Sequence, residues 1–130
     1  MDYSSKAKLL ATGHSDHTVR LWDPRSEGKK RQDQSVYLLL TFVMLEGTNV
    51  KMNLRGHTAW VSSVSWSKKS EYTLCTGSYD SSIRVWDIRS REPLYTVESD
   101  SDDKVLSVYW ENDQILSGGE DKKLHIYQAK

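Results

Sequence analysis

Short runs in which apolar and polar residues alternate recur along the chain and predict β-strands. In three of them a polar side chain separates two branched apolar residues: Val19-Arg20-Leu21, Ile83-Arg84-Val85 and Leu124-His125-Ile126. Successive side chains of a strand point to opposite faces, so this alternation suits pleated sheets. Long runs with apolar residues at helical spacing are absent from the sequence, and its five Trp and seven Tyr residues favour strands. The sequence therefore predicts an all-β fold.

Three segments of the chain superpose without gaps, and each is typical of a β-hairpin with an Asp at a tight turn. The glycines of the second and third segments, Gly77 and Gly118, lie about 40 residues apart, which is a normal period for a propeller blade. Further strands are expected at Val61–Trp66 and Val105–Trp110 on the inner side, and at Leu94–Val97 on the outer side. The three hairpin segments are Leu10–Asp23, Leu74–Asp87 and Ile115–Gln128.

These repeats predict a partial β-propeller of about two and a half to three four-stranded antiparallel blades. The stretch from Gly56 to Asp87 opens with Gly-His and closes with Trp-Asp, which is the pattern of a complete blade. The first repeat keeps little of an inner strand, and the last ends before an outer strand. We therefore predict a partial first blade (1–23), a linker with an apolar insertion (24–53), a complete blade (54–97) and a last blade without its outer strand (98–130).

The spacer before the complete blade contains a continuous apolar run, Tyr37–Leu45, that breaks the alternation. Either this run or Val50–Leu54 is a candidate for the outer strand of the first blade. As an outer strand the run would expose several large apolar side chains, which marks an aggregation hazard or a partner surface. Our hypothesis is that the run is an insertion foreign to the blade plan.

Charge and cysteine content narrow the class of protein. Eighteen basic and 18 acidic side chains give a formal net charge of zero. We therefore expect neither direct nucleic-acid binding nor direct membrane binding. The single cysteine, Cys75, rules out an internal disulfide and fits a reducing compartment. No secretory leader pattern follows Met1, so the sequence predicts a soluble intracellular protein.

Four residues of the complete blade have the spacing of a structural hydrogen-bonded tetrad rather than of a catalytic site. Asp80 in the turn would accept a hydrogen bond from the His57 ring. The ring would bond the Thr76 hydroxyl, and that hydroxyl would meet the Trp86 indole N–H. Such a buried polar chain is worthwhile only if every member is satisfied. The other repeats keep parts of this set: Thr12, Asp16 and Trp22 in the first, and Ser117, Asp121 and Tyr127 in the third. Ser101 stands where the His of the third blade is expected, so that blade should be the most weakly pinned.

We expect no catalytic residue, no cofactor and no metal. His14, His17 and His125 have no second ligand at metal spacing. The acidic stretch Glu98–Asp103 lacks the Gly and the spaced carboxylates of a calcium loop. No phosphate-binding loop or nucleophile elbow is present. The sequence therefore predicts that the protein is not an enzyme.

With these motifs the chain resembles the WD-repeat β-propeller proteins over all of its length except the spacer. Within them it is similar to the nucleolar family that works with pescadillo and block-of-proliferation proteins in maturation of the large ribosomal subunit precursor. The segments that carry this closer likeness are Met1–Ser4, Leu10–Arg25, His57–Val61, Lys104–Val108 and Ser117–Leu124.

The resemblance implies a carboxy-terminal fragment of a seven-bladed propeller that acts as a non-catalytic scaffold in ribosome biogenesis and rRNA processing. It implies pescadillo-type and block-of-proliferation-type partners, and a location in the nucleus and nucleolus, with the cytoplasm open to a fragment. WD-repeat proteins bind partners through residues before the inner strand and before the turn Asp. Those positions are Thr58, Trp60 and Tyr79 here, although Trp60 could instead pack on the neighbouring blade.

Two other functions remain open at the level of the sequence. Trp22-Asp23-Pro24-Arg25 and Trp86-Asp87-Ile88-Arg89 match a short pattern of WD-repeat adaptors that bring substrates to cullin ubiquitin ligases, with Arg25 and Arg89 as contact residues. The chain could also be a truncated product without independent activity, because stacked repeats need neighbours to bury their faces.

Overall fold

The computed structural model describes residues 1–23, 50–90, 92–98 and 102–128. Within these residues every regular element is a β-strand, and the strands form three antiparallel sheets in simple up-and-down order. The first sheet, called the first blade, contains β1 (Asp2–Ser4), β2 (Leu9–Gly13), β3 (Thr18–Trp22) and β4 (Val50–Arg55). The middle blade contains β5 (Val61–Trp66), β6 (Thr73–Ser78), β7 (Ser82–Asp87) and β8 (Pro93–Glu98). The third blade contains β9 (Val105–Glu111), β10 (Gln114–Gly119) and β11 (Leu124–Gln128).

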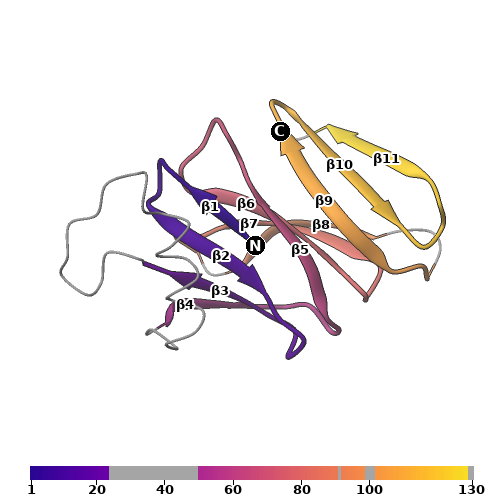
Figure 1. Cartoon of the computed structure of the whole chain (residues 1–130), viewed down its shortest axis with the longest axis horizontal. Coiled ribbons are helices and arrows are strands. Elements are labelled where there is room, and N and C mark those ends of the chain that lie inside the picture. Colours follow the sequence, from indigo (N-terminus) through magenta and orange to yellow (C-terminus); the bar gives the residue numbers. More distant parts are fainter. Residues whose placement is uncertain (24–49, 91, 99–101, 129–130) are drawn as a thin grey trace.

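The three blades lie side by side in chain order, with the middle blade between the other two (Figure 1). The inner strand β5 packs on β1 and β2 of the first blade, and β9 packs on β5 and β6 of the middle blade. The predicted all-β partial propeller is confirmed by this arrangement.

The same turn chemistry closes the central hairpin of every blade. The Asp carboxylate at the turn accepts a hydrogen bond from the backbone N–H two residues later. The residue between them adopts a positive φ, with values of 73° at His17, 67° at Ser81 and 62° at Lys122. Asp favours such turns because its short side chain bonds its own backbone and stabilises the reversal. The turn residues are Asp16, Asp80 and Asp121.

The outer strand of the first blade is β4, which pairs with β3 from Thr18 opposite Arg55 to Trp22 opposite Val50. Of the two candidate segments, the structure uses the one that begins at Val50. This strand crosses the boundary predicted between residues 53 and 54. The apolar run Tyr37–Leu45 lies outside the described residues, as does most of the predicted linker.

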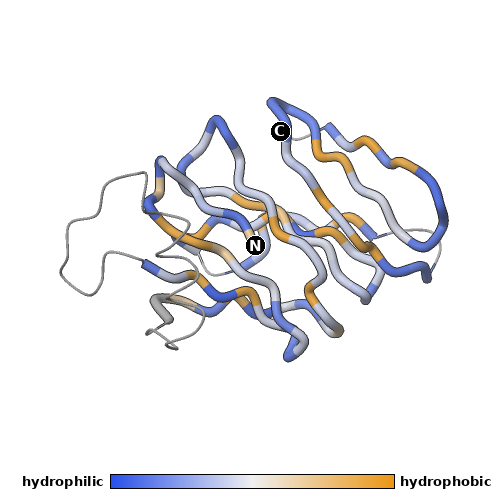
Figure 2. The backbone as a smooth tube through the Cα atoms, in the orientation of Figure 1, coloured by the Kyte–Doolittle hydropathy of each residue, from blue (hydrophilic) through white to orange (hydrophobic). Residues whose placement is uncertain are grey.

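Two apolar interfaces hold the blades together, and Figure 2 shows hydrophobic positions concentrated on the strands that form them. Each interface joins the valines and the Trp of one inner strand to small and branched residues on the preceding hairpin. The first interface includes Ala11, Val19, Leu21, Val61, Val64 and Trp66. The second includes Cys75, Ile83, Val85, Val105, Val108 and Trp110.

Glycine at two equivalent positions allows the blades to approach closely. A Cβ atom on Gly13 would lie 2.6 Å from the Val61 carbonyl oxygen, and one on Gly77 would lie 2.6 Å from Cγ1 of Val105. Neither distance is compatible with normal van der Waals contact. The inner-strand valines therefore require glycine opposite them.

Candidate functional site

Four side chains of the middle blade form one continuous hydrogen-bonded chain. Asp80 Oδ2 lies 2.9 Å from His57 Nδ1, and His57 Nε2 lies 2.6 Å from Thr76 Oγ1. The indole Nε1–H of Trp86 donates to the same Thr76 oxygen over 2.8 Å. The arrangement is consistent when Nδ1 of His57 donates to the carboxylate, Nε2 accepts from the Thr76 hydroxyl, and that hydroxyl accepts from Trp86. Every member then has a partner.

Burial keeps these four hydrogen-bonded side chains away from any substrate. The exposed fraction is 0% for the His57 side chain and 7% for that of Asp80. Burial alone would raise the pKa of the Asp80 carboxyl, but hydrogen bonds from His57, Ser82 and the Thr58 backbone N–H outweigh it and hold that pKa well below its usual range. The carboxylate is therefore ionised and engaged within the blade, which suits a structural role.

The first blade holds the corresponding positions differently. Trp22 Nε1 donates to Thr12 Oγ1 over 2.8 Å, and His14 Nε2 lies 2.6 Å from the same oxygen. Asp16 instead accepts from the Thr18 hydroxyl over 2.6 Å and forms an ion pair with Arg20. The contact of His14 with Thr12 was not predicted from the sequence. The spacing of two between these residues could have revealed it, because residues i and i+2 of a strand share a face.

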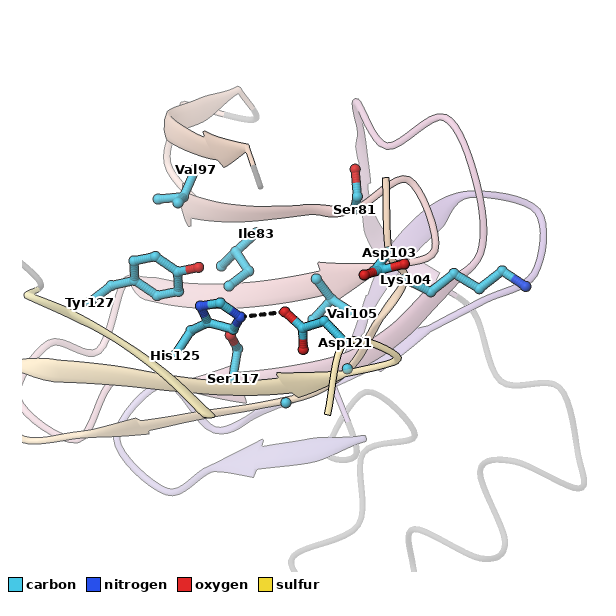
Figure 3. Close-up of a pocket in the computed structure, with 12 residues that line it drawn as sticks. Ser81, Ile83, Val97, Asp103, Lys104, Val105, Ser117, Asp121, His125 and Tyr127 are labelled. Atoms are coloured by element: carbon cyan, nitrogen blue, oxygen red, sulfur yellow. Dashed lines mark hydrogen bonds and ion pairs between the residues drawn. The ribbon is translucent and has the colours of Figure 1, made fainter. Parts of the chain in front are cut away.

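The third blade departs further from the middle one, as Figure 3 shows. Asp121 Oδ2 lies 2.6 Å from Nε2 of His125, which belongs to β11, and the His125 ring stacks on that of Tyr127. Ser117 is buried beside them. These side chains line a pocket that faces Ile83 of the middle blade. Ser101 lies outside the described residues. The spacing of four between Asp121 and His125 is the one sequence signal for this pair.

A stacked aromatic pair of exposed Trp60 and half-buried Tyr79 lies at the rim of the middle blade, beside Lys104 of the segment that leads into the third blade. The rings of Trp60 and Tyr79 stack with their centroids 5.4 Å apart, and Lys104 Nζ lies 5.0 Å from the centroid of the Tyr79 ring on that ring's face. The Trp60 side chain is 52% exposed. Backbone bonds fix the pair, because the Trp60 carbonyl accepts from the Tyr79 N–H over 2.8 Å. Thr58 is exposed close by, with its backbone N–H bound to Asp80.

Of the two arginines of the ligase-adaptor pattern, only Arg89 lies among the described residues. The Arg89 guanidinium donates to both carboxylate oxygens of Asp87 and lies over the Tyr72 ring at 4.2 Å. Its donors are thus directed to its own blade. Arg25 lies outside the described residues.

Three further features of the described residues concern metal binding, the reactivity of Cys75 and membrane-spanning helices. No group of three or more His, Cys, Asp or Glu side chains there has a geometry for metal binding. Burial raises the pKa of the Cys75 thiol to about 12, so this thiol is a poor nucleophile at neutral pH. None of the described residues belongs to a helix with the length and apolarity needed to cross a membrane.

The three antiparallel blades, their glycine-spaced interfaces and the hydrogen-bonded set of the middle blade agree with comparisons to known proteins. The family model of the nucleolar protein 10-like, N-terminal domain, a β-propeller, matches residues 1–130. The chain belongs to this family. The predicted resemblance to WD-repeat β-propellers with a role in ribosome biogenesis is thereby confirmed, together with the relatives described next.

Curated proteins that are similar to this chain carry the name ribosome biogenesis protein WDR12 homolog. The Dictyostelium discoideum relative is 38% identical over 98% of this chain and 26% of its own length. The Trichoplax adhaerens relative is 40% identical over 94% of this chain and 25% of its own length. The chain thus spans about a quarter of the length of these relatives.

A solved structure supports the fold of the chain. The β-propeller domain of Cps50 (Swd1) from Myceliophthora thermophila superposes with a TM-score of 0.69 at 21% identity. The match covers 98% of this chain and 34% of that chain. At this identity the likeness concerns the fold alone.

Proposed function

We propose that the chain is a non-catalytic protein-interaction segment that acts in biogenesis of the large ribosomal subunit. The names of its relatives support a role in ribosome biogenesis, and the family description supports a nucleolar location. The buried and fully bonded set around His57 supports a structural rather than catalytic use of its polar residues. We extend the proposal to pescadillo-type and block-of-proliferation-type subunits as partners.

The observation that carries this proposal is the stacked pair Trp60 and Tyr79 with Lys104 above it. Large aromatic side chains that are fixed in place before binding lose little conformational freedom on contact, and they are enriched among the residues that dominate binding energy. Lys104 adds a positive charge next to the rings, so the surface fits a partner segment that combines an apolar or aromatic side chain with a carboxylate.

The test measures binding of the tagged chain to purified pescadillo-type and block-of-proliferation-type proteins, and its sedimentation with large-subunit precursors. Trp60→Ala should weaken binding by about 2 kcal/mol, which is roughly 30-fold in Kd. Leu94→Ala is the matched control, because Leu94 is 53% exposed on the outer strand β8, away from the rim pair. It should leave Kd unchanged.

Thermal melts of both variants establish that each remains folded. Loss of binding in Leu94→Ala equal to that in Trp60→Ala would show that the rim pair is not the contact. Absence of the chain from nucleoli and from large-subunit precursors would contradict the proposed role itself.

A further inference from the structure

The same backbone hydrogen bond fixes a pair of side chains at the rim of two neighbouring blades. In the middle blade the Tyr79 N–H donates to the Trp60 carbonyl over 2.8 Å, and in the third blade the Glu120 N–H donates to the Lys104 carbonyl over 3.1 Å. Tyr79 and Glu120 each directly precede the turn Asp of their blade, and Trp60 and Lys104 each directly precede the first valine of an inner strand. An aromatic pair and a charged pair therefore occupy equivalent positions.

Lys104 joins these two pairs into one row. Its Nζ lies over the Tyr79 ring, 5.0 Å from the centroid, and 3.7 Å from Oε1 of Glu120. The Tyr79 ring in turn stacks on that of Trp60 with the centroids 5.4 Å apart. The contacts thus run from Trp60 through Tyr79 and Lys104 to Glu120, and these four residues are here called the rim row.

A close backbone approach holds the charged end of the rim row in place. A Cβ atom on Gly119 would overlap the Lys104 carbonyl oxygen, so glycine lets the two segments meet where Glu120 bonds Lys104. The Lys104 N–H also donates to Oε2 of Glu120 over 3.4 Å. The rim row is therefore largely formed before a ligand arrives, which reduces the conformational entropy that binding costs.

The two charged side chains of the rim row remain available to a ligand. Lys104 and Glu120 are 47% and 45% exposed, and an exposed ion pair of this kind contributes little to stability. Among the described residues, none accepts a hydrogen bond from Lys104 Nζ, so its N–H donors are open to a carboxylate. In Figure 3 the Lys104 side chain extends away from the pocket between the middle and third blades.

We propose that the rim row binds a linear peptide segment in which an acidic side chain lies between an apolar or aromatic side chain and a basic one. The apolar side chain packs on Trp60, the acidic one accepts hydrogen bonds from Lys104, and the basic one pairs with Glu120. An extended chain rises about 3.3 Å per residue, so a segment of about five residues reaches along the row.

Glu120 is thereby assigned as the residue that selects the order of charges in the partner. Complementary charges across an interface discriminate between partners more than they add affinity. A segment with the basic side chain in the middle would place it against Lys104 and its acidic side chain against Glu120, which is repulsive at both positions. The inference rests on the proposed function for the use of Trp60 as a contact, and it names the chemistry of the partner segment.

The experiment measures binding of two labelled peptides to the full chain by fluorescence anisotropy. Both peptides carry Phe, Asp and Arg separated by single Gly residues, so that the three side chains of an extended peptide share one face. One has Asp in the middle and the other has Arg in the middle, with the same composition and net charge. We expect the Asp-centred peptide to bind at least about fivefold more tightly, and this preference to shrink at high salt.

Exchange of the two charges tests the assignment directly. The double variant Lys104→Glu with Glu120→Lys keeps an ion pair in the rim row but reverses its order, so it should prefer the Arg-centred peptide. The matched control, Lys69→Asp with Asp113→Lys, exchanges an exposed ion pair in the loops that follow the inner strands, at the opposite end of those strands from the rim row. It should leave the preference unchanged. Thermal melts establish that each variant is folded.

Glu120→Gln is a milder second variant. It should weaken binding of the Asp-centred peptide by about threefold, and leave unchanged the binding of a peptide in which Gln replaces the Arg. An equal effect on both peptides would assign Glu120 to the positioning of Lys104 and overturn its role in selection.

The proposal is wrong if the native chain binds both peptides equally or binds neither, if the charge exchange leaves the preference as it was, or if the control exchange also inverts it. The proposed function survives such results when pescadillo-type and block-of-proliferation-type proteins bind and Trp60→Ala weakens that binding. Conversely, selection between the peptides without binding of those proteins would support the rim row and contradict the proposed partners.

Discussion

The middle and third blades have the same hairpin register but different surroundings. Thr76 pairs with Arg84 in the middle blade as Ser117 pairs with His125 in the third. The middle blade is covered on both faces, and its Trp86 is 0% exposed. Among the described residues, the third blade is covered only on the face that packs against the middle blade.

The two blades also differ in the residue that pairs with the turn Asp. In the middle blade Asp80 bonds His57, which precedes the inner strand, and the bonds continue to Thr76. In the third blade Asp121 bonds His125 of the last strand. Repeats of this kind are stabilised by their neighbours. The polar set of the middle blade thus includes a residue from the segment before its inner strand, whereas Asp121 and His125 both come from the hairpin of the third blade.

The largest expected effect compares the hairpin face of the middle blade, which the third blade covers, with the uncovered hairpin face of the third blade. Gly77→Val should destabilise the chain by about 3 kcal/mol, because the new side chain collides with Val105 and Val108. Gly118→Val should change the free energy of unfolding by less than about 0.5 kcal/mol, since it meets open space. Urea unfolding measures both. Equal losses would show that the two faces are not different.

The next effect concerns the hydrogen bonds of the two blades. Thr76→Val leaves Nε2 of the buried His57 ring and the Trp86 indole N–H without their shared partner, and should cost about 2 kcal/mol in unfolding free energy. Ser117→Ala should cost less than about 1 kcal/mol, because no hydrogen bond joins Ser117 Oγ to another described side chain. Chemical denaturation of the pair provides the measurement. A larger loss for Ser117→Ala would reverse the comparison.

Acid should act on the middle blade through Asp80. Its pKa is lowered in the folded chain, so below about pH 4 the unfolded chain binds a proton that the folded chain does not, and stability falls. The difference in unfolding free energy between the native chain and Asp80→Asn should therefore be largest near pH 7 and shrink as the pH falls below about 4. Denaturation at several pH values measures this difference; one that is constant with pH would contradict the account. Asp121→Asn is the third-blade counterpart.

The smallest effect is expected at His125. Its pairing with Asp121 is partly exposed, with 36% of the His125 side chain accessible, so water and salt weaken it. His125→Ala should shift the urea midpoint less than Thr76→Val does. A shift as large as that of Thr76→Val would indicate that the third blade depends on this pair as strongly as the middle blade depends on its buried set.

The fold could be predicted from the sequence because strand alternation, turn Asp residues and repeat spacing act locally. The inner strand at Val61, the outer strand before Glu98 and the all-β class follow from such patterns. The choice of β4 could not be predicted, since two segments of the spacer were equally able to pair with β3. In the structure the segment Val50–Arg55 pairs with β3.

The candidate site was less predictable because it depends on contacts between repeats. The spacing puts Thr76 and Trp86 on adjacent strands, but it does not reveal that Lys104 of the next blade covers Tyr79. His14 beside Thr12 was likewise missed, because the expected histidine lay elsewhere in the repeat. The sequence does not distinguish Gly118 from Gly13 and Gly77, although in the structure a Cβ atom on Gly118 would meet nothing within 4 Å.

The most direct test of the account is native-state hydrogen exchange on the unmodified chain. A blade covered on both faces should open only with global unfolding, whereas a blade covered on one face should open locally at lower free energy. We predict that amides of β6 and β7 exchange at least about tenfold more slowly than those of β10 and β11. Equal protection of the two hairpins would contradict the claim that the third blade has an uncovered hairpin face.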